Sequence, residues 1–448
     1  MKRIFLFFII GALMLISAGC NKLLDLQPYQ SISEEVSLES DANVKSVLKG
    51  AYAQFDDESI YLGCILRNAE LLGAANECMW TGTYSGPRQI YNKQMNSANE
   101  DATAQWIDSY QVVNITNNVL SALAVVNEAD RNRVEGEALF LRSLMFFDLV
   151  RFYAQQYQTG SASTQLGIPI VLTPTRGIDN NSFVTRKSVE EVYNQVITDL
   201  ISAASKLPED NGVYASSGAA NALLARVYLQ KYDYAKARDA ATTVISSGMY
   251  ELQPTYADEF NNDDNSAEDI FATQITSQDL SSAMTEFFSV PEFGGRDGDI
   301  EILEGHLNLY SPGDQRRDLF FMGNGGMRSG KWNNLYGIVN LFRLAEMYLI
   351  RAECNLRLGT TIGSTPLDDY NVIHVRAGLT PAASVTLDEI LLERRLELSF
   401  EGFRIHDLRR LHENVGTLTF DDPKLVFPIP FRETEANPKL KTQQNPGY

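Results

Sequence analysis

The chain has 448 residues, of which 44% are hydrophobic and 21% charged, and its formal net charge is -19 at pH 7. This composition excludes an intrinsically disordered chain and is sufficient for one large core or two smaller ones. Because a strongly negative surface repels phosphates and sulfates, nucleic acid and anionic polymers are poor partners unless a local basic patch overrides the field.

The N-terminus has the layout of a secretory signal. Lys2 and Arg3 precede an apolar run that is shorter than the roughly 20 residues needed to span a bilayer. Small residues then lead directly to Cys20, which resembles a bacterial lipobox with Ser17 at the position that usually holds Leu. The resemblance implies that residues 1–19 are a signal peptide and that Cys20 carries the lipid. The alternative is an ordinary secretory signal with a chance cysteine.

Residues 20–40 are interpreted as a lipidated tether. Acyl chains on one cysteine hold a protein on a membrane without spanning it, and every later apolar stretch is broken by charge. The tether contains Leu23, Leu24, Leu26 and Pro28. We therefore expect its first part to pack on the surface of a partner.

Helical periodicity dominates the rest of the chain. Ser40 or Asp41 is placed to cap a first helix, and Ser188 and Glu191 occupy the positions of a capping box. Strand-like alternation is scarce, so we predict an all-α, mostly helical fold. Further helical patterns cover residues 106–123, 132–155, 219–248, 342–359 and 386–411.

One part of this pattern is typical of tetratricopeptide repeats, in which small and aromatic residues pack two helices closely. The chain therefore predicts several degenerate helix pairs that stack into a superhelix; an unrelated helical bundle is the alternative. The residues in repeat positions are Leu224, Ala225, Tyr228, Tyr234, Ala237 and Ala241.

The helical period fades between residues 251 and 334, where Gly, Asp, Asn and Ser are frequent. An irregular segment of this length is unusual in a compact fold unless it has a function. We therefore predict one helical domain over residues 41–448 with a ligand-binding, loop-rich insertion at about 251–334.

Two short stretches carry aromatic residues without a helical period. Trp80 and Tyr84 lie among Thr, Gly and Ser, and Trp332 and Tyr336 lie among Gly and Asn. Exposed aromatic rings can stack on the C–H face of a sugar while amide and guanidinium groups bind its hydroxyls. We therefore predict ligand contacts at these four aromatics and at Asn76 and Arg88. The alternative is that the rings pack under loops.

Trp106, in a helical context, is predicted to be core.

The sequence contains no motif that is typical of a catalytic site. The sequence has no HExxH, no G-x-S-x-G and no P-loop, and its four histidines lack metal-ligand spacing. Four acidic residues, Asp297, Asp299, Glu301 and Glu304, lie close together but lack the Gly at position six of an EF-hand loop, so a calcium site is only a weak alternative. We predict no catalytic residue, no metal and no cofactor. The sequence permits a disulfide between Cys64 and Cys78 but does not require one.

Two C-terminal motifs resemble the SusD/RagB nutrient-uptake lipoproteins of Bacteroidota. The first is the block "ERRLELSFEGFRIHDL", and the second is the ending from "PIP" to "QNPGY". Helices such as "GEALFLRSLMFFDLVRFY" and "FRLAEMYLIRAE" extend the resemblance over essentially the whole chain. His374 stands where the family usually has Arg. We expect Glu393, Glu397 and Glu401, spaced every four residues with Arg394 and Arg404 nearby, to form ion pairs along a helix and to clamp the C-terminal segment. The prolines of that segment indicate an extended chain laid across the surface.

The resemblance implies a function and a partner. Members act as lids that capture oligomers for a SusC-type TonB-dependent barrel, so we expect a surface-exposed, lipid-anchored protein of the outer membrane. Many members bind glycans, and RagB-like members bind peptides. We expect glycan capture, with peptide capture as the alternative. A surface glycoside hydrolase is less expected, because paired catalytic carboxylates must flank a sugar across a cleft.

Overall fold

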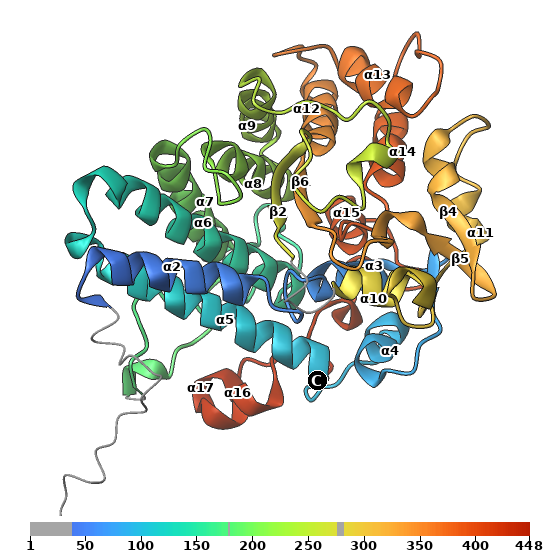
Figure 1. Cartoon of the computed structure of the whole chain (residues 1–448). Helices are drawn as coiled ribbons and strands as arrows, with labels where there is room; N and C mark the ends of the chain where they lie inside the picture. The colour runs from blue at the N-terminus through green and yellow to red at the C-terminus, as the bar shows by residue number, and fades with distance from the viewer. Residues whose placement is uncertain (1–37, 178–179, 276–281) are drawn as a thin grey trace, which may run out of the picture.

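The computed structural model describes residues 38–177, 180–275 and 282–448, so the predicted signal peptide, Cys20 and nearly all of the tether lie outside the described residues. Helices dominate this part of the chain, which confirms the prediction of a mostly helical fold (Figure 1). The α-helices are α2 (Asp41–Phe55), α3 (Cys64–Gly73), α4 (Ser85–Asn92), α5 (Glu100–Ser121), α6 (Glu128–Tyr153), α7 (Val189–Lys206), α8 (Ser217–Gln230), α9 (Tyr234–Ser246), α10 (Ala283–Phe288), α11 (Glu304–Leu307), α12 (Leu344–Leu358), α13 (Pro366–Arg376), α14 (Leu387–Glu397), α15 (Arg404–Arg410), α16 (Phe431–Ala436) and α17 (Pro438–Lys441).

Both predicted helix starts are confirmed. The Ser40 hydroxyl accepts from the backbone N–H of Asn43 at 3.3 Å and caps α2. At α7, the Ser188 hydroxyl accepts from Glu191 N at 3.2 Å while the Glu191 carboxylate accepts from Ser188 N at 2.8 Å. Each bond satisfies an N–H that the first helical turn leaves unpaired.

Successive long helices pack side by side in the order α5, α6, α7, α8, α9, α12, as a stack of helix pairs does (Figure 1). Ala225 and Tyr228 of α8 and Ala237 and Ala241 of α9 are buried. The small alanine side chains let the two helices approach, as the repeat pattern predicts. Trp106 is 3% exposed on α5, which confirms its assignment to the core.

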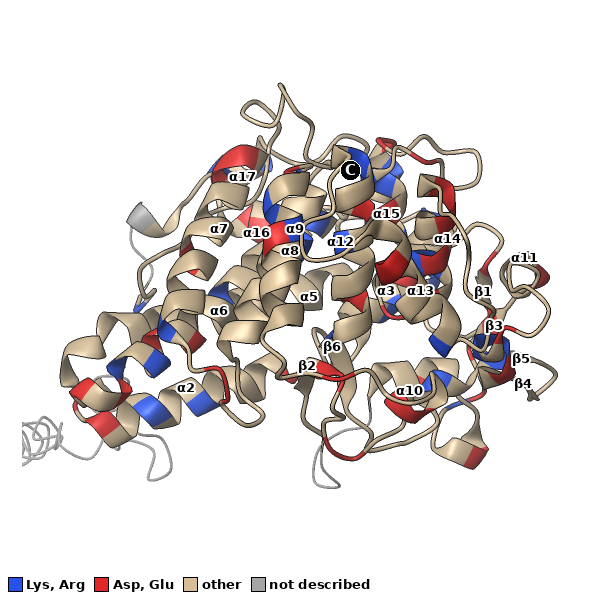
Figure 2. Cartoon of the chain, turned by 90° about the horizontal axis from the view of Figure 1, so that it is seen from above, with Lys and Arg blue, Asp and Glu red and all other residues tan. Residues whose placement is uncertain are grey.

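The loop-rich segment after α9 is built around short antiparallel pairs. Strand β1 (Cys78–Trp80) pairs with β3 (Ile300–Ile302), β2 (Asp269–Thr273) pairs with β6 (Val339–Arg343), and β4 (Phe320–Gly323) forms a hairpin with β5 (Gly326–Ser329). Acidic and basic residues both gather around α3, α10 and these strands (Figure 2).

The helical pattern predicted over residues 386–411 is broken in the structure. Phe400 and Gly402 have φ values of 60° and 85°, which end the turn that follows α14. A Cβ at residue 402 would lie 2.6 Å from a methyl group of Leu66, so this position requires glycine. Glu70 of α3 accepts from the N–H groups of Gly402 and Phe403 at 2.8 and 3.0 Å. Glu401 is therefore not on the same helix as Glu397.

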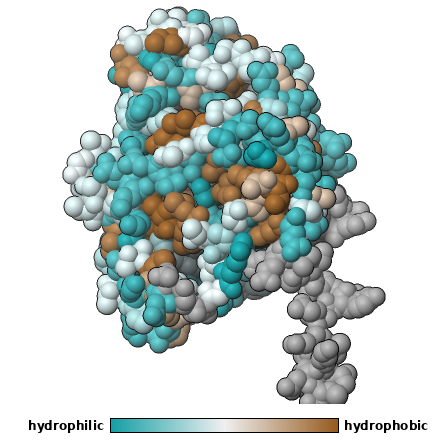
Figure 3. All heavy atoms as spheres, turned by 90° about the vertical axis from the view of Figure 1, so that its left-hand side faces the viewer, coloured by the Kyte–Doolittle hydropathy of each residue, from teal (hydrophilic) through white to brown (hydrophobic). Residues whose placement is uncertain are grey.

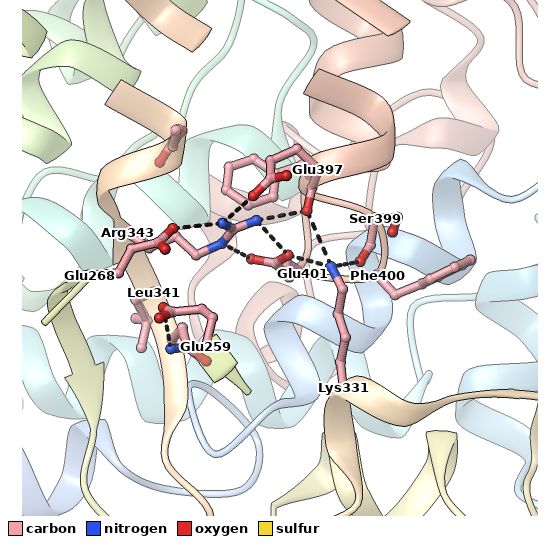
Figure 4. Close-up of polar contacts among 12 residues, drawn as sticks. Glu259, Glu268, Lys331, Leu341, Arg343, Glu397, Ser399, Phe400 and Glu401 are labelled. Carbon is pink, nitrogen blue, oxygen red and sulfur yellow. Dashed lines mark hydrogen bonds and ion pairs between the residues drawn. The ribbon is translucent and has the colours of Figure 1, made fainter. Parts of the chain in front are cut away.

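Glu393, Glu397 and Glu401 do form ion pairs, but not along one helix with Arg394 or Arg404, which pair with Asp407 and Glu77 instead. The prediction that they clamp the C-terminal segment is also wrong. Their partners come from β6, from the segment before β4 and from α13: Arg343 contacts Glu397 at 2.6 Å and Glu401 at 2.7 Å, and Arg316 contacts Glu393 at 2.7 Å. The guanidinium of Arg343 also contacts Glu268, and Lys331 contacts Glu401 at 2.5 Å (Figure 4). His374, in place of Arg, contacts Glu393 at 3.1 Å.

The C-terminal segment is held by other residues and is not a purely extended surface strand. Residues 425–430 are buried, and α16 and α17 follow them. Asn445 donates to the carbonyl oxygens of Tyr153 and Phe427 at 2.8 and 2.7 Å, and Arg186 donates to Gln443 O at 2.7 Å. The prolines are compatible with this path of the C-terminal segment, but its buried apolar side chains and these hydrogen bonds hold it in place.

The structure answers the open question about the cysteines. Cys64, Cys78 and Cys354 are buried free thiols. Cys64 begins α3 and Cys78 begins β1, and burial raises the pKa of Cys64 to about 12. The thiols are therefore small core side chains, and no disulfide joins Cys64 to Cys78.

Candidate functional site

The two predicted aromatic stretches meet at α10, although about 250 residues separate them in sequence. The Trp80 and Tyr84 rings lie 5.6 and 5.9 Å from the ring of Phe287 on α10. From the other stretch, Asn334 O accepts from Thr285 Oγ1 at 3.1 Å. The neighbouring Asn333 side chain accepts from Ser289 at 2.7 Å. The short helix therefore positions both stretches.

The expectation that both tryptophans are exposed is wrong. Trp80 is 6% exposed because it packs between β3 and Phe287, and Trp332 is 3% exposed. The Trp332 Nε1 donates to Phe400 O at 3.2 Å, which anchors its loop to the segment after α14. The alternative that the rings pack under loops holds for these two residues, and neither offers a ring face to a ligand.

The tyrosines differ, because Tyr84 is 44% and Tyr336 38% exposed. The guanidinium carbon of Arg296 lies 4.1 Å from the Tyr84 ring centroid. Arg296 is itself held by Asp299 Oδ2, which accepts from its Nε at 3.0 Å, and it donates to Thr83 Oγ1 at 3.2 Å. We call Tyr84, Arg296 and the buried residues that support them, Phe287 and Asp299, the Tyr84 platform.

The remaining predicted contacts have different positions. Arg88 is exposed, but its Nη2 donates to the carbonyl oxygens of Gly82 and Thr83 at 2.9 and 3.1 Å, so it supports the loop that presents Tyr84. Asn76 is exposed at the other end of β1, against Gly305. The structure therefore groups Arg88 with Tyr84 and leaves Asn76 apart.

Carboxylates surround the Tyr84 platform. Burial raises the pKa of Glu58, Glu286 and Asp299 above their ordinary values. Glu286 lies 4.0 Å from Arg296, and the Arg67 guanidinium stands over the Phe287 ring at 4.6 Å. The surroundings are thus acidic, with arginines between the acids. Glu58 and Glu286 are half-buried, whereas Asp299 is buried, so hydroxyl groups of a neutral ligand can donate to the first two carboxylates.

Sequence reasoning missed Arg296, Glu286 and Phe287, because they follow a stretch without periodicity and their role depends on contact with Tyr84. The sequence indicates Asp299 only as part of a weak alternative calcium site, whereas in the structure it pairs with Arg296. Among the described residues, no group of three or more His, Cys, Asp or Glu is placed to hold a metal ion. No described helix is both long and apolar enough to cross a membrane.

Two family models match consecutive parts of the chain. The model described as "Starch-binding associating with outer membrane" matches residues 22–229, and the model of the SusD family matches residues 246–419. The chain belongs to the SusD family. This agrees with the resemblance that its C-terminal motifs indicate.

Relatives of this SusD-family protein match over most or all of its length. SusD-like protein P2 of Formosa agariphila is 24% identical over 100% of both chains. A solved SusD superfamily protein of Bacteroides thetaiotaomicron has a TM-score of 0.81 and 26% identity, and covers 91% of this chain and 100% of its own. A putative sugar binding protein of Bacteroides vulgatus has a TM-score of 0.82 and 26% identity, over 92% and 99% of the two chains.

Proposed function

We propose that this SusD-family protein captures oligosaccharides at the cell surface and delivers them, as a lid, to a SusC-type TonB-dependent barrel in the outer membrane. The proposal includes a lipid on Cys20 that anchors the protein after removal of residues 1–19. Family membership, and the sugar-binding name of the similar Bacteroides vulgatus protein, support this reading.

The exposed Tyr84 ring is the observation that carries the proposal. A sugar ring gains contact area by lying on an aromatic ring, and the platform places a guanidinium over one face of the Tyr84 ring and carboxylates near it. Because Asp299 and Glu286 already balance Arg296, the platform carries no excess positive charge for acidic polymers. The expected ligand is therefore a neutral oligosaccharide.

Binding without cleavage is proposed, because the platform itself contributes a single carboxylate, that of the buried Asp299. Asp299 accepts from Arg296 and is committed to that pair. Tyr336 is kept as a second proposed contact, since it is 38% exposed on the loop that is fastened to α10. Asn76 is kept only as a peripheral contact.

Peptide capture is the second candidate. The half-buried carboxylates of Glu58 and Glu286 would suit a basic peptide, whose lysines and arginines pair with carboxylates. The same Tyr84 ring would then contact an apolar or cationic side chain.

The test uses the mature chain with Cys20→Ser, offered to a panel of neutral oligosaccharides and a panel of basic peptides. We expect intact oligosaccharide to be retained and recovered uncleaved, with Tyr84→Ala weakening binding about tenfold or more. Phe431→Ala is the matched control, because Phe431 is an aromatic residue that is 56% exposed on α16. Binding of peptides alone would replace the glycan proposal, and release of sugar products would overturn both.

A further inference from the structure

An apolar groove of about 670 Å³ runs between α5, residues 169–175 and the helices α16 and α17. Its wall at 169–175 is fixed along α5: Tyr110 donates to Pro169 O at 2.7 Å, and Asn114 Oδ1 accepts from Thr175 N at 2.7 Å. The groove is therefore a built feature of the surface. Its half-buried apolar side chains are those of Ile107, Ile115, Val171, Phe183 and Val184.

The described chain begins close to this groove. Asp41, at the start of α2, accepts from the backbone N–H of Asn127 at 2.9 Å, so α2 begins at the turn between α5 and α6 (Figure 1). Ile115 lies six residues before the end of α5 at Ser121, which is roughly 9 Å along a helix axis. Figure 3 shows the face of the molecule that lies on the left in Figure 1, where apolar side chains gather in separate patches among polar ones.

The chain before Leu38 is long enough to reach the whole groove. Residues 21–37 span up to roughly 55 Å when extended, at about 3.3 Å per residue. They include three leucines near one end, and apolar area removed from water stabilises by about 25 cal/mol per Å². Asp25 lies between these leucines, while the Arg432 side chain at the groove is 68% exposed and 3.7 Å from its partner Glu433.

We propose that Leu23, Leu24 and Leu26 dock in the groove between α5 and α16–α17, with Asp25 beside Arg432. The residues that follow Cys20 then bind the body of the protein itself. Little free tether would separate the lipid from the body, so the membrane anchor would sit at α16–α17 instead of at the start of α2. This proposal does not depend on which ligand the protein captures.

Disulfide trapping tests the docking in the mature chain with Cys20→Ser. Leu24→Cys is combined with Ala436→Cys, an exposed residue at the groove. The control pair combines Leu24→Cys with Val125→Cys, which is 41% exposed beside the start of α2. The native thiols of Cys64, Cys78 and Cys354 are buried, so they do not compete with the introduced cysteines for disulfide formation. We expect the groove pair to close at least tenfold faster under mild oxidation. A freely moving tether would reach residue 125 at least as often, and equal rates would overturn the proposal.

Hydrogen exchange provides a second readout that needs no new thiol. Replacing Leu23, Leu24 and Leu26 with Ser is expected to raise deuterium uptake at residues 106–115 and 432–440, because the groove loses its cover. Replacing Gln27, Gln30 and Ser31 with Ala is the control and should leave uptake unchanged. If both variants behave like the parent chain, the leucines serve another surface, such as that of a partner protein, and the proposal is wrong.

Discussion

The indole Nε1 of Trp332 donates to the carbonyl oxygen of Phe400 at 3.2 Å. This bond joins the loop that carries Tyr336 to the residue whose left-handed backbone ends the turn after α14. A residue that the sequence indicates as a sugar platform is therefore an internal anchor between two distant segments. Its neighbour Lys331 adds to the same anchor by contacting Glu401.

Trp332→Ala is expected to lower the free energy of unfolding by about 3–5 kcal/mol, because a large buried ring is lost. Trp332→Phe keeps most of the apolar contact and loses one hydrogen bond, so its cost is about 1–2 kcal/mol. Tyr336→Ala is the exposed control, with an expected change within about 0.5 kcal/mol. Denaturant unfolding measures all three, and equal stability of Trp332→Ala and the parent chain would contradict the anchor role.

Arg343→Met should be among the most destabilising single changes in this region. It leaves the buried Glu268, Glu397 and Glu401 with fewer partners, and breaking a buried ion pair costs about 3–5 kcal/mol. Lys441→Met removes an exposed pair with Glu435 and should cost less than about 1 kcal/mol. The difference in thermal midpoint between these two variants is the measurement, and similar midpoints would refute the assigned role of the network.

Acid is expected to destabilise the protein through its buried carboxylates. Burial opposes ionisation, but Arg394 and Arg410 lower the pKa of Asp407 to about 2, and Arg376 and Arg343 lower the pKa of Glu397 further. Because these pKa values lie below those of the unfolded chain, at about 4, the stabilisation is complete above pH 4 and is lost as the pH falls toward 2.

The thermal midpoint measured between pH 6 and pH 2.5 checks this sign. It should drop steeply below pH 4, and Asp407→Asn should flatten that drop while lowering the midpoint at pH 6. A midpoint that rises on acidification would show that carboxylates with raised pKa values, such as Glu70, dominate instead.

Arg296→Met is expected to weaken oligosaccharide binding about five- to tenfold, because it removes the cation beside Tyr84 and the partner of Asp299. Arg317→Met, at an exposed position on another segment, is the control and should bind as the parent chain does. Titration calorimetry with a bound oligosaccharide from the panel gives both affinities. Unchanged affinity in Arg296→Met would show that the oligosaccharide binds elsewhere than at the Tyr84 platform.

The thiols give a direct check of the cysteine assignment. In the native mature chain with Cys20→Ser, Cys64, Cys78 and Cys354 should resist thiol reagents, because burial raises the pKa of each. After unfolding without reductant, three thiols should react. A count of one would mean that two of them are paired in the protein.

Much of the fold is readable from local pattern. The caps at Ser40 and Ser188, the core position of Trp106 and the helix pair around Tyr228 depend on residues a few positions apart, and the structure has each of them. The helical pattern does not predict the break at Gly402, because the apolar spacing continues across it. The break depends on the left-handed backbone of Gly402 and on its close contact with Leu66, which is distant in sequence.

By itself, the sequence determined the helical class, the helix starts and the family motifs, because these depend on caps, periodicity and short spacings that every part of the chain carries locally. Only the tertiary structure decided which aromatics are exposed, since α10 covers Trp80 and leaves Tyr84 at the surface. It also decided that Glu397 pairs with Arg343 instead of clamping the C-terminus. Burial and ion pairing depend on what packs against a residue, and those partners are distant in sequence.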